Sequence, residues 1–227
     1  MNKSFLTVSQ ITFYVEKGYL LLSGLIPDDL VAKSEQAMWN CMGLSISKPD
    51  DWPGSFTGSA VYSNKDLIKV YTEDFLTVAW QLSQGDLEKS NFSPPNAGFA
   101  INTFPSDEEW APHGPHLDHA IKEHRHKTFP QPFRIASMTF LNDVCPHGGG
   151  TIIWPGSHKK LEALSRSDPD YYSLVWVLNE DLKKIDIGDF VELAPKAGDV
   201  LFYHPLCVHS GSTNSSSKPR LAMNMKW

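Results

Sequence analysis

The first part of the chain places apolar side chains at the spacing of α-helices. In the segment 28–43, apolar or small residues recur at intervals that put them on one helix face, at positions 30, 31, 34, 37, 38, 41 and 42. Pro27 and two acidic residues open this segment and Gly43 closes it, as helix boundaries require. A similar pattern predicts a second helix over residues 65–84, with Asn64 as its N-cap.

Residues 11–25 predict a short helix or turn that runs into a strand. From residue 93 onward, short apolar runs alternate with Gly, Pro, Asn and Asp, the runs being GFAINTF, FRIASMTFLNDV, GTIIWPG, FVELAP, DVLFYHPLCVH and RLAMNMKW. This punctuation is typical of an antiparallel sandwich or barrel. We therefore expect a mainly β protein, in which a mostly helical N-terminal layer (1–92) packs on a core of about eight strands (93–227). Because no linker separates the two parts, residues 1–227 are expected to form a single domain.

Composition narrows the class of protein without identifying it. The 227 residues are 41% hydrophobic and 20% charged, which is ordinary globular usage and suffices to bury a core. A formal net charge of -6 argues against a nucleic-acid partner. The N-terminal sequence lacks the pattern of a signal peptide, and its longest apolar run is far too short to span a bilayer. The three cysteines are scattered and suggest neither disulfides nor zinc, so we expect a cytoplasmic protein. The expected partner is a small molecule.

Candidate chemistry is concentrated in residues 110–120, which read WAPHGPHLDHA. His116 and Asp118 are two positions apart, so on a strand their side chains would point to the same face. Imidazole and carboxylate groups together suit a transition metal, and a third ligand has to come from elsewhere. His209 ends the apolar run DVLFYHPLCVH and is the best candidate, with His204 on the same run as its rival. Two histidines and one carboxylate form the facial triad of non-haem Fe(II) sites.

Arg220 follows the turn-rich segment SGSTNSSSKP and opens the last apolar run. A strand, a turn and a returning strand would bring Arg220 near the metal, yet too far from it to act as a ligand. A guanidinium group is suited to a bidentate grip on a carboxylate. A dicarboxylate such as 2-oxoglutarate would then have one end on the metal and the other on Arg220.

These motifs resemble the phytanoyl-CoA dioxygenase family of Fe(II)- and 2-oxoglutarate-dependent oxygenases. The resemblance is carried by PHLD at 115–118, GGGTIIWPGSHKK at 148–160, AGDVLFYHPLCVH at 197–209, and Arg220 eleven positions after the last histidine. The opening segment GYLLLSGLIPDDL is also similar to that of the family. The resemblance implies a double-stranded β-helix (a cupin-like jelly roll) with N-terminal helices packed on one sheet, and Fe(II), 2-oxoglutarate and O2 as cofactors.

The resemblance also implies roles for individual residues. His116, Asp118 and His209 would be the catalytic iron ligands, and Arg220 would hold the distal carboxylate of 2-oxoglutarate. Many relatives have a serine two positions after the distal histidine, where this chain has a glycine, so Ser212 is expected to take over that contact. Asn102, on the run GFAINTF, is expected to be a second polar contact to the co-substrate. Met138 corresponds to an aromatic position that lines the co-substrate pocket in some members.

The implied reaction is the hydroxylation or other oxidation of an unactivated C–H bond, with release of succinate and CO2. Related halogenases replace the carboxylate ligand by a small residue, so Asp118 favours hydroxylation over halogenation. No basic cluster reads as a site for coenzyme A phosphates, and the run KEHRHK at 122–127 is expected to be a solvated loop. The expected substrate is therefore a small natural product or an amino-acid-derived metabolite.

Two other functions remain open from the sequence. A cupin-type metal enzyme would share the barrel without using 2-oxoglutarate, but cupins favour two histidines and a glutamate in their first motif, and Arg220 has no role in that interpretation. A non-catalytic binding protein on the same barrel predicts the loss of a ligand or of the arginine. Both are present in this chain.

Overall fold

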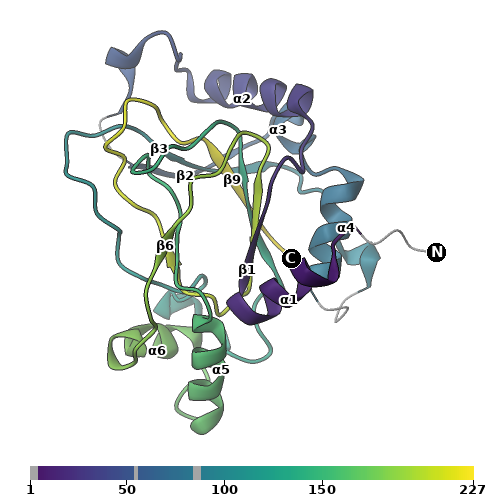
Figure 1. Cartoon of the computed structure of the whole chain (residues 1–227), viewed down its shortest axis with the longest axis vertical. Helices are drawn as coiled ribbons and strands as arrows, with labels where there is room; N and C mark the ends of the chain where they lie inside the picture. Colours follow the sequence, from purple (N-terminus) through teal and green to yellow (C-terminus); the bar gives the residue numbers. More distant parts are fainter. Residues whose placement is uncertain (1–4, 54–55, 84–87) are drawn as a thin grey trace.

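The computed structural model describes residues 5–53, 56–83 and 88–227, which fold into two antiparallel sheets flanked by helices (Figure 1). Within these residues, the larger sheet has six strands in the order β1-β7-β4-β9-β3-β2 and the smaller has three in the order β6-β5-β8. The larger sheet consists of β1 (Tyr19–Leu22), β2 (Phe56–Tyr62), β3 (Gly98–Thr103), β4 (Ala136–Phe140), β7 (Val200–Tyr203) and β9 (Ala222–Lys226). The smaller sheet consists of β5 (Ile152–Ile153), β6 (Val191–Glu192) and β8 (His209–Ser210).

The helices gather at different ends of the sheets. They are α1 (Val8–Lys17), α2 (Asp28–Met42), α3 (Lys65–Ile68), α4 (Glu73–Leu82), α5 (Ser157–Ser167) and α6 (Val175–Glu180), with short 3-10 turns at Pro49–Asp51, Lys89–Asn91, Lys122–His124 and Asp181–Lys184. In Figure 1, α5 and α6 lie together at the end of the molecule opposite α2. Among the described residues, none of the helices has both the length and the apolar character needed to cross a membrane.

The helix boundary signals in the sequence are confirmed for the first helices. Pro27 is the N-cap of α2, and Gly43 ends it with a left-handed φ of 68° that side chains other than glycine rarely adopt. The single helix predicted over 65–84 is wrong, because α3 ends at Ile68 and α4 begins after Thr72. The Thr72 side chain accepts a hydrogen bond from Phe75 N and so starts a new helix. Residue 84 lies outside the described residues.

The expected division at residue 92 needs correction. All six predicted apolar runs contain strands, and the described residues after 93 hold seven strands against the expected eight or so. However, the N-terminal part is not only a helical layer, because β1 pairs with β7 and β2 pairs with β3 in the large sheet. Conversely, the part predicted to be β core also contains helices, because α5 and α6 lie within residues 93–227. The short helix running into a strand that was predicted over 11–25 is confirmed by α1 and β1, but local periodicity does not reveal that the partner of β1 is β7.

The alternation of side chains along β7 separates two apolar clusters. Val200 and Phe202 pack in the cluster that contains the buried residues of α2 and α4. Leu201 and Tyr203 point the other way, into a cluster shared with Ile153 of the small sheet. This period of two follows from the pleat of the strand. As a result, Tyr203 faces the space between the sheets, where the candidate site lies.

Candidate metal centre

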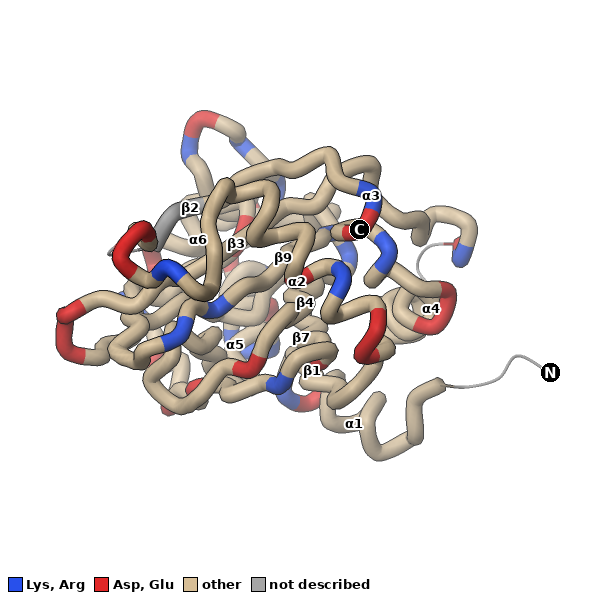
Figure 2. The backbone as a smooth tube through the Cα atoms, turned by 90° about the horizontal axis from the view of Figure 1, so that it is seen from above, with Lys and Arg blue, Asp and Glu red and all other residues tan. Residues whose placement is uncertain are grey.

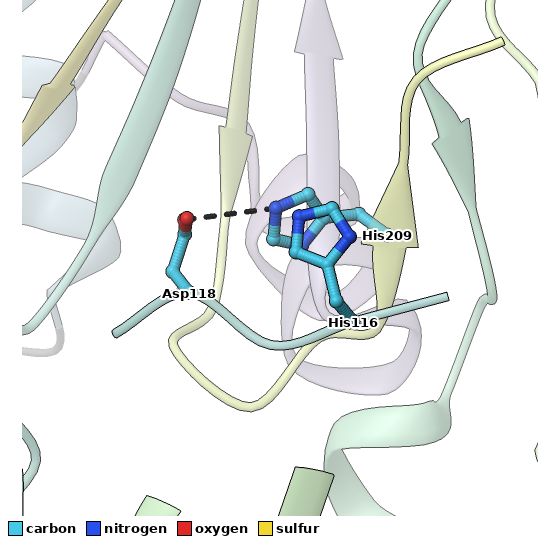
Figure 3. A group of neighbouring side chains, drawn as sticks. All are labelled: His116, Asp118 and His209. Carbon is cyan, nitrogen blue, oxygen red and sulfur yellow. Dashed lines mark ion pairs between the residues drawn. The ribbon is translucent and has the colours of Figure 1, made fainter. Parts of the chain in front are cut away.

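His116, Asp118 and His209 meet between the two sheets. One ligand atom from each residue lies within 4.8 Å of the others. Figure 3 shows the two imidazole rings side by side with the Asp118 carboxylate facing them. The distance from His209 Nε2 to Asp118 Oδ2 is 3.6 Å. The geometry thus brings together the three residues that the sequence pattern selected.

The backbone brings the two histidines together by a two-residue bridge. His116 N donates to His209 O at 3.0 Å, and His209 N donates to His116 O at 3.2 Å. The expectation that His116 and Asp118 share a regular strand is wrong, because His116 lies in an isolated bridge and Asp118 in a turn. His119, which follows Asp118, has a φ of 59°. The turn directs the carboxylate back toward the histidines, so the two side chains converge without a strand.

Backbone carbonyls hold the two imidazole rings. His209 Nδ1 lies 3.0 Å from Cys207 O, and His116 Nδ1 lies 3.3 Å from Gly114 O. Because a carbonyl only accepts, each Nδ1 carries the proton and each Nε2 is left with a lone pair for a metal. Burial lowers the pKa of His209, which keeps it in the neutral form that metal binding requires.

Asp118 is held by two side chains from the large sheet. The Tyr203 hydroxyl donates to Asp118 Oδ2 at 2.9 Å, and Lys226 Nζ lies 3.1 Å from Asp118 Oδ1. Asn224 Nδ2 donates to the same Tyr203 hydroxyl at 3.0 Å, which directs the tyrosine proton toward the carboxylate. Burial raises the pKa of Asp118, but the Lys226 charge and the hydrogen bonds from Tyr203 and Lys226 lower the pKa overall. Asp118 is therefore an ionised carboxylate, as a metal ligand must be.

These three supporting residues were not predicted from the sequence. Asn224 and Lys226 lie on the last apolar run, two positions apart, so the pleat places both on the same face. A polar residue every second position in an otherwise apolar strand is a signal of an inward-facing polar site, and it was available in RLAMNMKW. Tyr203 gives no comparable signal, because tyrosine is common in buried strands.

Arg220 is buried, and it has no counter-ion among the described residues. The residue is 3% exposed, and it pairs with Thr103 through two backbone hydrogen bonds next to the start of β9. Its Nη2 donates to Ile101 O at 3.3 Å, while Nε has no hydrogen-bond partner among the described residues. Burial lowers its pKa to about 10, so the group is still charged at neutral pH. A buried cation with spare donors is costly unless an anion binds it.

The three candidate ligands and Arg220 line one cavity of about 270 Å³. Its other lining residues are Ile101, Thr103, His113, Met138, Thr151, Tyr203, Ser210, Gly211 and Asn224. Thr151 Oγ1 is buried and has no partner among the described residues, so it is a further donor available to a ligand. Met138 lines the cavity, in agreement with the position assigned to it from the resemblance.

Residues 14–222 match the family model described as phytanoyl-CoA dioxygenase (PhyH). The chain belongs to the phytanoyl-CoA dioxygenase family. Members of this family use Fe(II), 2-oxoglutarate and O2. No curated protein matches the sequence.

Solved structures with the same fold include one α-ketoglutarate-dependent enzyme and two proteins solved with 2-oxoglutarate, which is the same compound. The non-heme α-ketoglutarate dependent carbocyclase SnoK from nogalamycin biosynthesis is 17% identical, with a TM-score of 0.63 over 98% of this chain and 83% of that one. EctD from S. alaskensis, with 2-oxoglutarate and 5-hydroxyectoine, is 17% identical, with a TM-score of 0.62 over 99% and 76%. EvdO2 from Micromonospora carbonacea var. aurantiaca, complexed with 2-oxoglutarate, is 16% identical, with a TM-score of 0.63 over 97% and 90%. At these identities the likeness shows the fold.

Two residues expected to contact the co-substrate are not brought to the cavity. Asn102 points to the opposite face of β3, where its Oδ1 accepts from Ala222 N and its Nδ2 lies 3.2 Å from Met42 Sδ of α2. Its neighbours on β3, Ile101 and Thr103, line the cavity instead. Because side chains alternate along a strand, an error of one position moves a residue to the wrong face.

Ser212 is also directed away from the cavity. Its hydroxyl donates to Gly150 O at 2.9 Å and is buried there. Ser210 and Gly211 line the cavity in its place. The expectation that Ser212 replaces the serine contact of relatives is therefore corrected, since the hydroxyl is already bonded to the backbone of the smaller sheet.

The other histidines lie outside the triad. His204 accepts from Leu206 N at Nδ1, and its ring centroid is 5.1 Å from that of His158, in a different cavity. His113 lines the candidate cavity but is absent from the cluster of ligand atoms. The basic run 122–127 forms a 3-10 turn and a loop. Elsewhere on the chain, Lys and Arg are interspersed among Asp and Glu in the view of Figure 2.

Proposed function

We propose that this protein is an Fe(II)- and 2-oxoglutarate-dependent oxygenase that hydroxylates, or otherwise oxidises, an unactivated C–H bond of a small molecule, with release of succinate and CO2. One observation carries the proposal: a cluster of two imidazoles and one carboxylate shares a cavity with a buried arginine for which the described part of the chain offers no counter-ion. We also propose that the two sheets form a double-stranded β-helix and that residues 1–227 are one domain. The pairing of β1 with β7 supports both, because it joins the N-terminal part to the core sheet.

The donors present fit Fe(II). His116 and His209 each offer a neutral Nε2, and Asp118 offers one oxygen because Lys226 engages the other. These three groups occupy one face of a metal and leave positions for a chelating co-substrate. Arg220 fits the distal carboxylate of 2-oxoglutarate, with Nε and Nη donors in the geometry of a bidentate pair. When bound, iron and 2-oxoglutarate together with O2 supply the oxidation of the C–H bond.

The protein's own side chains orient the reactants and exclude water. Ile101 and Met138 add apolar side chains to the cavity lining, and Arg220 is itself buried, so a carboxylate paired with the arginine would be removed from bulk solvent. The buried Thr151 hydroxyl is placed to donate to a bound carboxylate. Tyr203 and Lys226 keep Asp118 ionised and fix its orientation. In this arrangement the co-substrate is held at both ends before the substrate enters.

The cavity favours a small free substrate. At about 270 Å³ it lies at the lower end of the range for ligand pockets, and the co-substrate takes part of that space. A natural product or an amino-acid-derived metabolite suits this size. Proteins with similar folds include an enzyme of nogalamycin biosynthesis and one solved with 5-hydroxyectoine, which agrees with a substrate of this kind.

Hydroxylation is the proposed outcome because Asp118 occupies the position that halogenases leave for halide. The similar folds also include a carbocyclase and an epimerase, so ring closure and epimerisation are the alternatives that a product analysis must separate. A cupin-type enzyme that does not use 2-oxoglutarate and a non-catalytic binding protein both leave the buried Arg220 charge unexplained.

Anaerobic addition of Fe(II) and then 2-oxoglutarate tests the proposal without a known substrate. The expected result is the weak visible charge-transfer band of the iron chelate. The band should vanish in Asp118→Ala and should require much more 2-oxoglutarate in Arg220→Ala. Lys196→Ala serves as the control, since Lys196 is an exposed residue paired with Asp143. Iron binding without the band would favour the cupin-type enzyme, and no iron binding at all would refute the metal centre.

A further inference from the structure

The residue between the first two proposed iron ligands is associated with α6 through both its backbone and its side chain. Leu117 stands between His116 and Asp118, and its side chain is 2% exposed in an apolar cluster that includes Val175 of α6. The backbone N–H of Leu117 donates to Asn179 Oδ1, also on α6, at 2.7 Å. One helix therefore binds the peptide N–H of the residue that separates the two ligands and contributes to the apolar cluster in which its side chain packs.

The same helix and the residues just before it contact the chain that follows the ligands. Segment 122–128 continues from Asp118 and is tied to segment 173–176 by backbone bonds and one cation–π contact. These contacts are Val175 N to His126 O at 3.0 Å, Thr128 N to Ser173 O at 3.0 Å, the Lys127–Leu174 bridge, and Lys122 Nζ at 4.8 Å from the centre of the Trp176 ring. The chain from Leu117 to Thr128 thus depends on α6 for its position.

The direction of the Leu117 N–H bears directly on the ligand geometry. This N–H belongs to the planar peptide that joins His116 to Leu117, so its direction follows ψ of His116 and φ of Leu117. These are two of the four dihedral angles that separate the Cα atoms of His116 and Asp118. The His116 backbone is already fixed by its bridge to His209. Holding the next peptide in place therefore fixes the position of the Asp118 backbone relative to His116, independently of the contacts that the Asp118 side chain makes.

We propose that Asn179 is a positioning residue of the iron centre, which sets the spacing of His116 and Asp118 through the peptide of Leu117. This inference rests on the proposed function, because it assumes that the triad binds Fe(II). Asn179 does not touch the metal or the co-substrate. Outer contacts of this kind maintain ligand geometry, and their removal in metal sites lowers metal affinity by about 10- to 100-fold.

The test is an anaerobic Fe(II) titration of the full-length, metal-free protein and its variants. Asn179→Leu removes the acceptor at similar volume, and Asn179→Asp keeps an oxygen that accepts the same hydrogen bond. Glu180→Gln is the control, since Glu180 is the next residue of α6 and is exposed. We expect about a 10- to 100-fold weaker Fe(II) affinity in Asn179→Leu, affinity close to wild type in Asn179→Asp, and no change in Glu180→Gln.

A second readout separates positioning from a general loss of stability. Co(II) substituted for Fe(II) gives visible absorption that reports on ligand geometry, and the spectrum should change in Asn179→Leu and return in Asn179→Asp. The thermal midpoint of each metal-free variant is measured alongside. A purely structural role would lower the midpoint and leave both the Fe(II) affinity and the Co(II) spectrum unchanged well below that temperature, which would overturn the inference.

Two further outcomes are distinguishable. If wild-type protein binds no Fe(II), both the proposed function and this inference are contradicted. If wild type binds Fe(II) and Asn179→Leu binds it equally well, only the inference falls. Should Asn179→Leu not fold, Asn179→Gln is measured instead, because it displaces the acceptor on a longer side chain. Weaker Fe(II) binding by that variant supports the inference, and wild-type binding overturns it.

Discussion

The Tyr203 hydroxyl donates a 2.9 Å hydrogen bond to Asp118 Oδ2, the carboxylate oxygen that faces His209. The two residues lie 85 positions apart in the chain. Tyr203 comes from the large sheet, whereas Asp118 lies in a turn, so this bond ties the candidate metal loop to that sheet. Burial and the nearby Asp118 charge raise the pKa of Tyr203, and the hydroxyl therefore stays protonated as a donor.

Tyr203→Phe should weaken Fe(II) binding by about 10-fold or more, because Asp118 loses the donor that orients it. The fold should be retained, since Asn224 Nδ2 still donates to Ser137 O at 2.9 Å. The measurement is an anaerobic Fe(II) titration. Tyr19→Phe is the matched control, because Tyr19 lies opposite Tyr203 in the sheet and its hydroxyl makes no hydrogen bond among the described residues. Equal affinities of the two variants would contradict the role assigned to Tyr203.

Arg220→Leu should weaken 2-oxoglutarate binding by at least about 30-fold while leaving the ligand-free protein as stable as wild type, or more so. Loss of a buried charged partner costs about 2–5 kcal/mol in binding, which is at least roughly 30-fold in affinity. The free energy of unfolding should not fall, because among the described residues the substitution removes a buried charge that has no counter-ion and one side-chain hydrogen bond, to Ile101 O. Calorimetric titration with 2-oxoglutarate measures the change in binding, and urea unfolding of the ligand-free protein measures the change in stability. A large loss of stability would show that Arg220 serves the fold rather than a ligand.

Acid should destabilise the metal-free protein through His204. Burial, with a smaller effect of His158, lowers the pKa of His204 to about 3. The unfolded chain takes up this proton near pH 6.5 and the folded protein only near pH 3. The stability that His204 contributes is therefore present above pH 6.5 and is lost as the pH falls toward 3, at up to about 1.4 kcal/mol per pH unit.

The measurement is the urea unfolding free energy between pH 7.5 and 5.5. His204→Asn keeps an acceptor for Leu206 N, as Nδ1 does in the wild type, and should reduce the pH dependence. His124→Asn, at an exposed histidine, is the control. Unchanged pH dependence in His204→Asn would mean that other buried groups dominate.

Gly18→Ala should destabilise the fold far more than Gly24→Ala. Both glycines have positive φ, at 78° and 61°, so each alanine carries a backbone strain of about 1–2 kcal/mol. At Gly18 the added Cβ would also lie 2.4 Å from His158 Nδ1, whereas nothing lies within 4 Å of a Cβ at Gly24. The His158 ring is held by Val15 O, so overpacking should add about 1–3 kcal/mol. Urea unfolding of both variants measures the difference, and equal losses would show that the ring moves freely.

Much of the candidate site was predictable because its residues carry their chemistry in local patterns. His116 and Asp118 are two positions apart, and His209 and Arg220 end and begin apolar runs. The structure brings all four to one cavity. The helix α2 was equally predictable, since its capping residues and its apolar face are properties of consecutive residues.

The errors arose where a position depends on a distant partner. Asn102 and Ser212 were expected in the cavity, but a shift of one position along an extended chain turns a side chain to the opposite face. The pairing of β1 with β7 and the interruption at Thr72 likewise depend on neighbours that local periodicity does not show.

The sequence by itself determined the kinds of donor available, their order along the chain and the alternation that sorts apolar from polar faces. Only the tertiary structure decided which faces meet: that Tyr203 and Lys226 reach Asp118, that Asn179 of α6 binds the Leu117 peptide, and that Arg220 is buried with no counter-ion in the described ranges. The physical reason is that donor chemistry and side-chain periodicity are local properties of the chain. Burial and hydrogen-bond partnership, by contrast, exist only once segments distant in sequence have packed together.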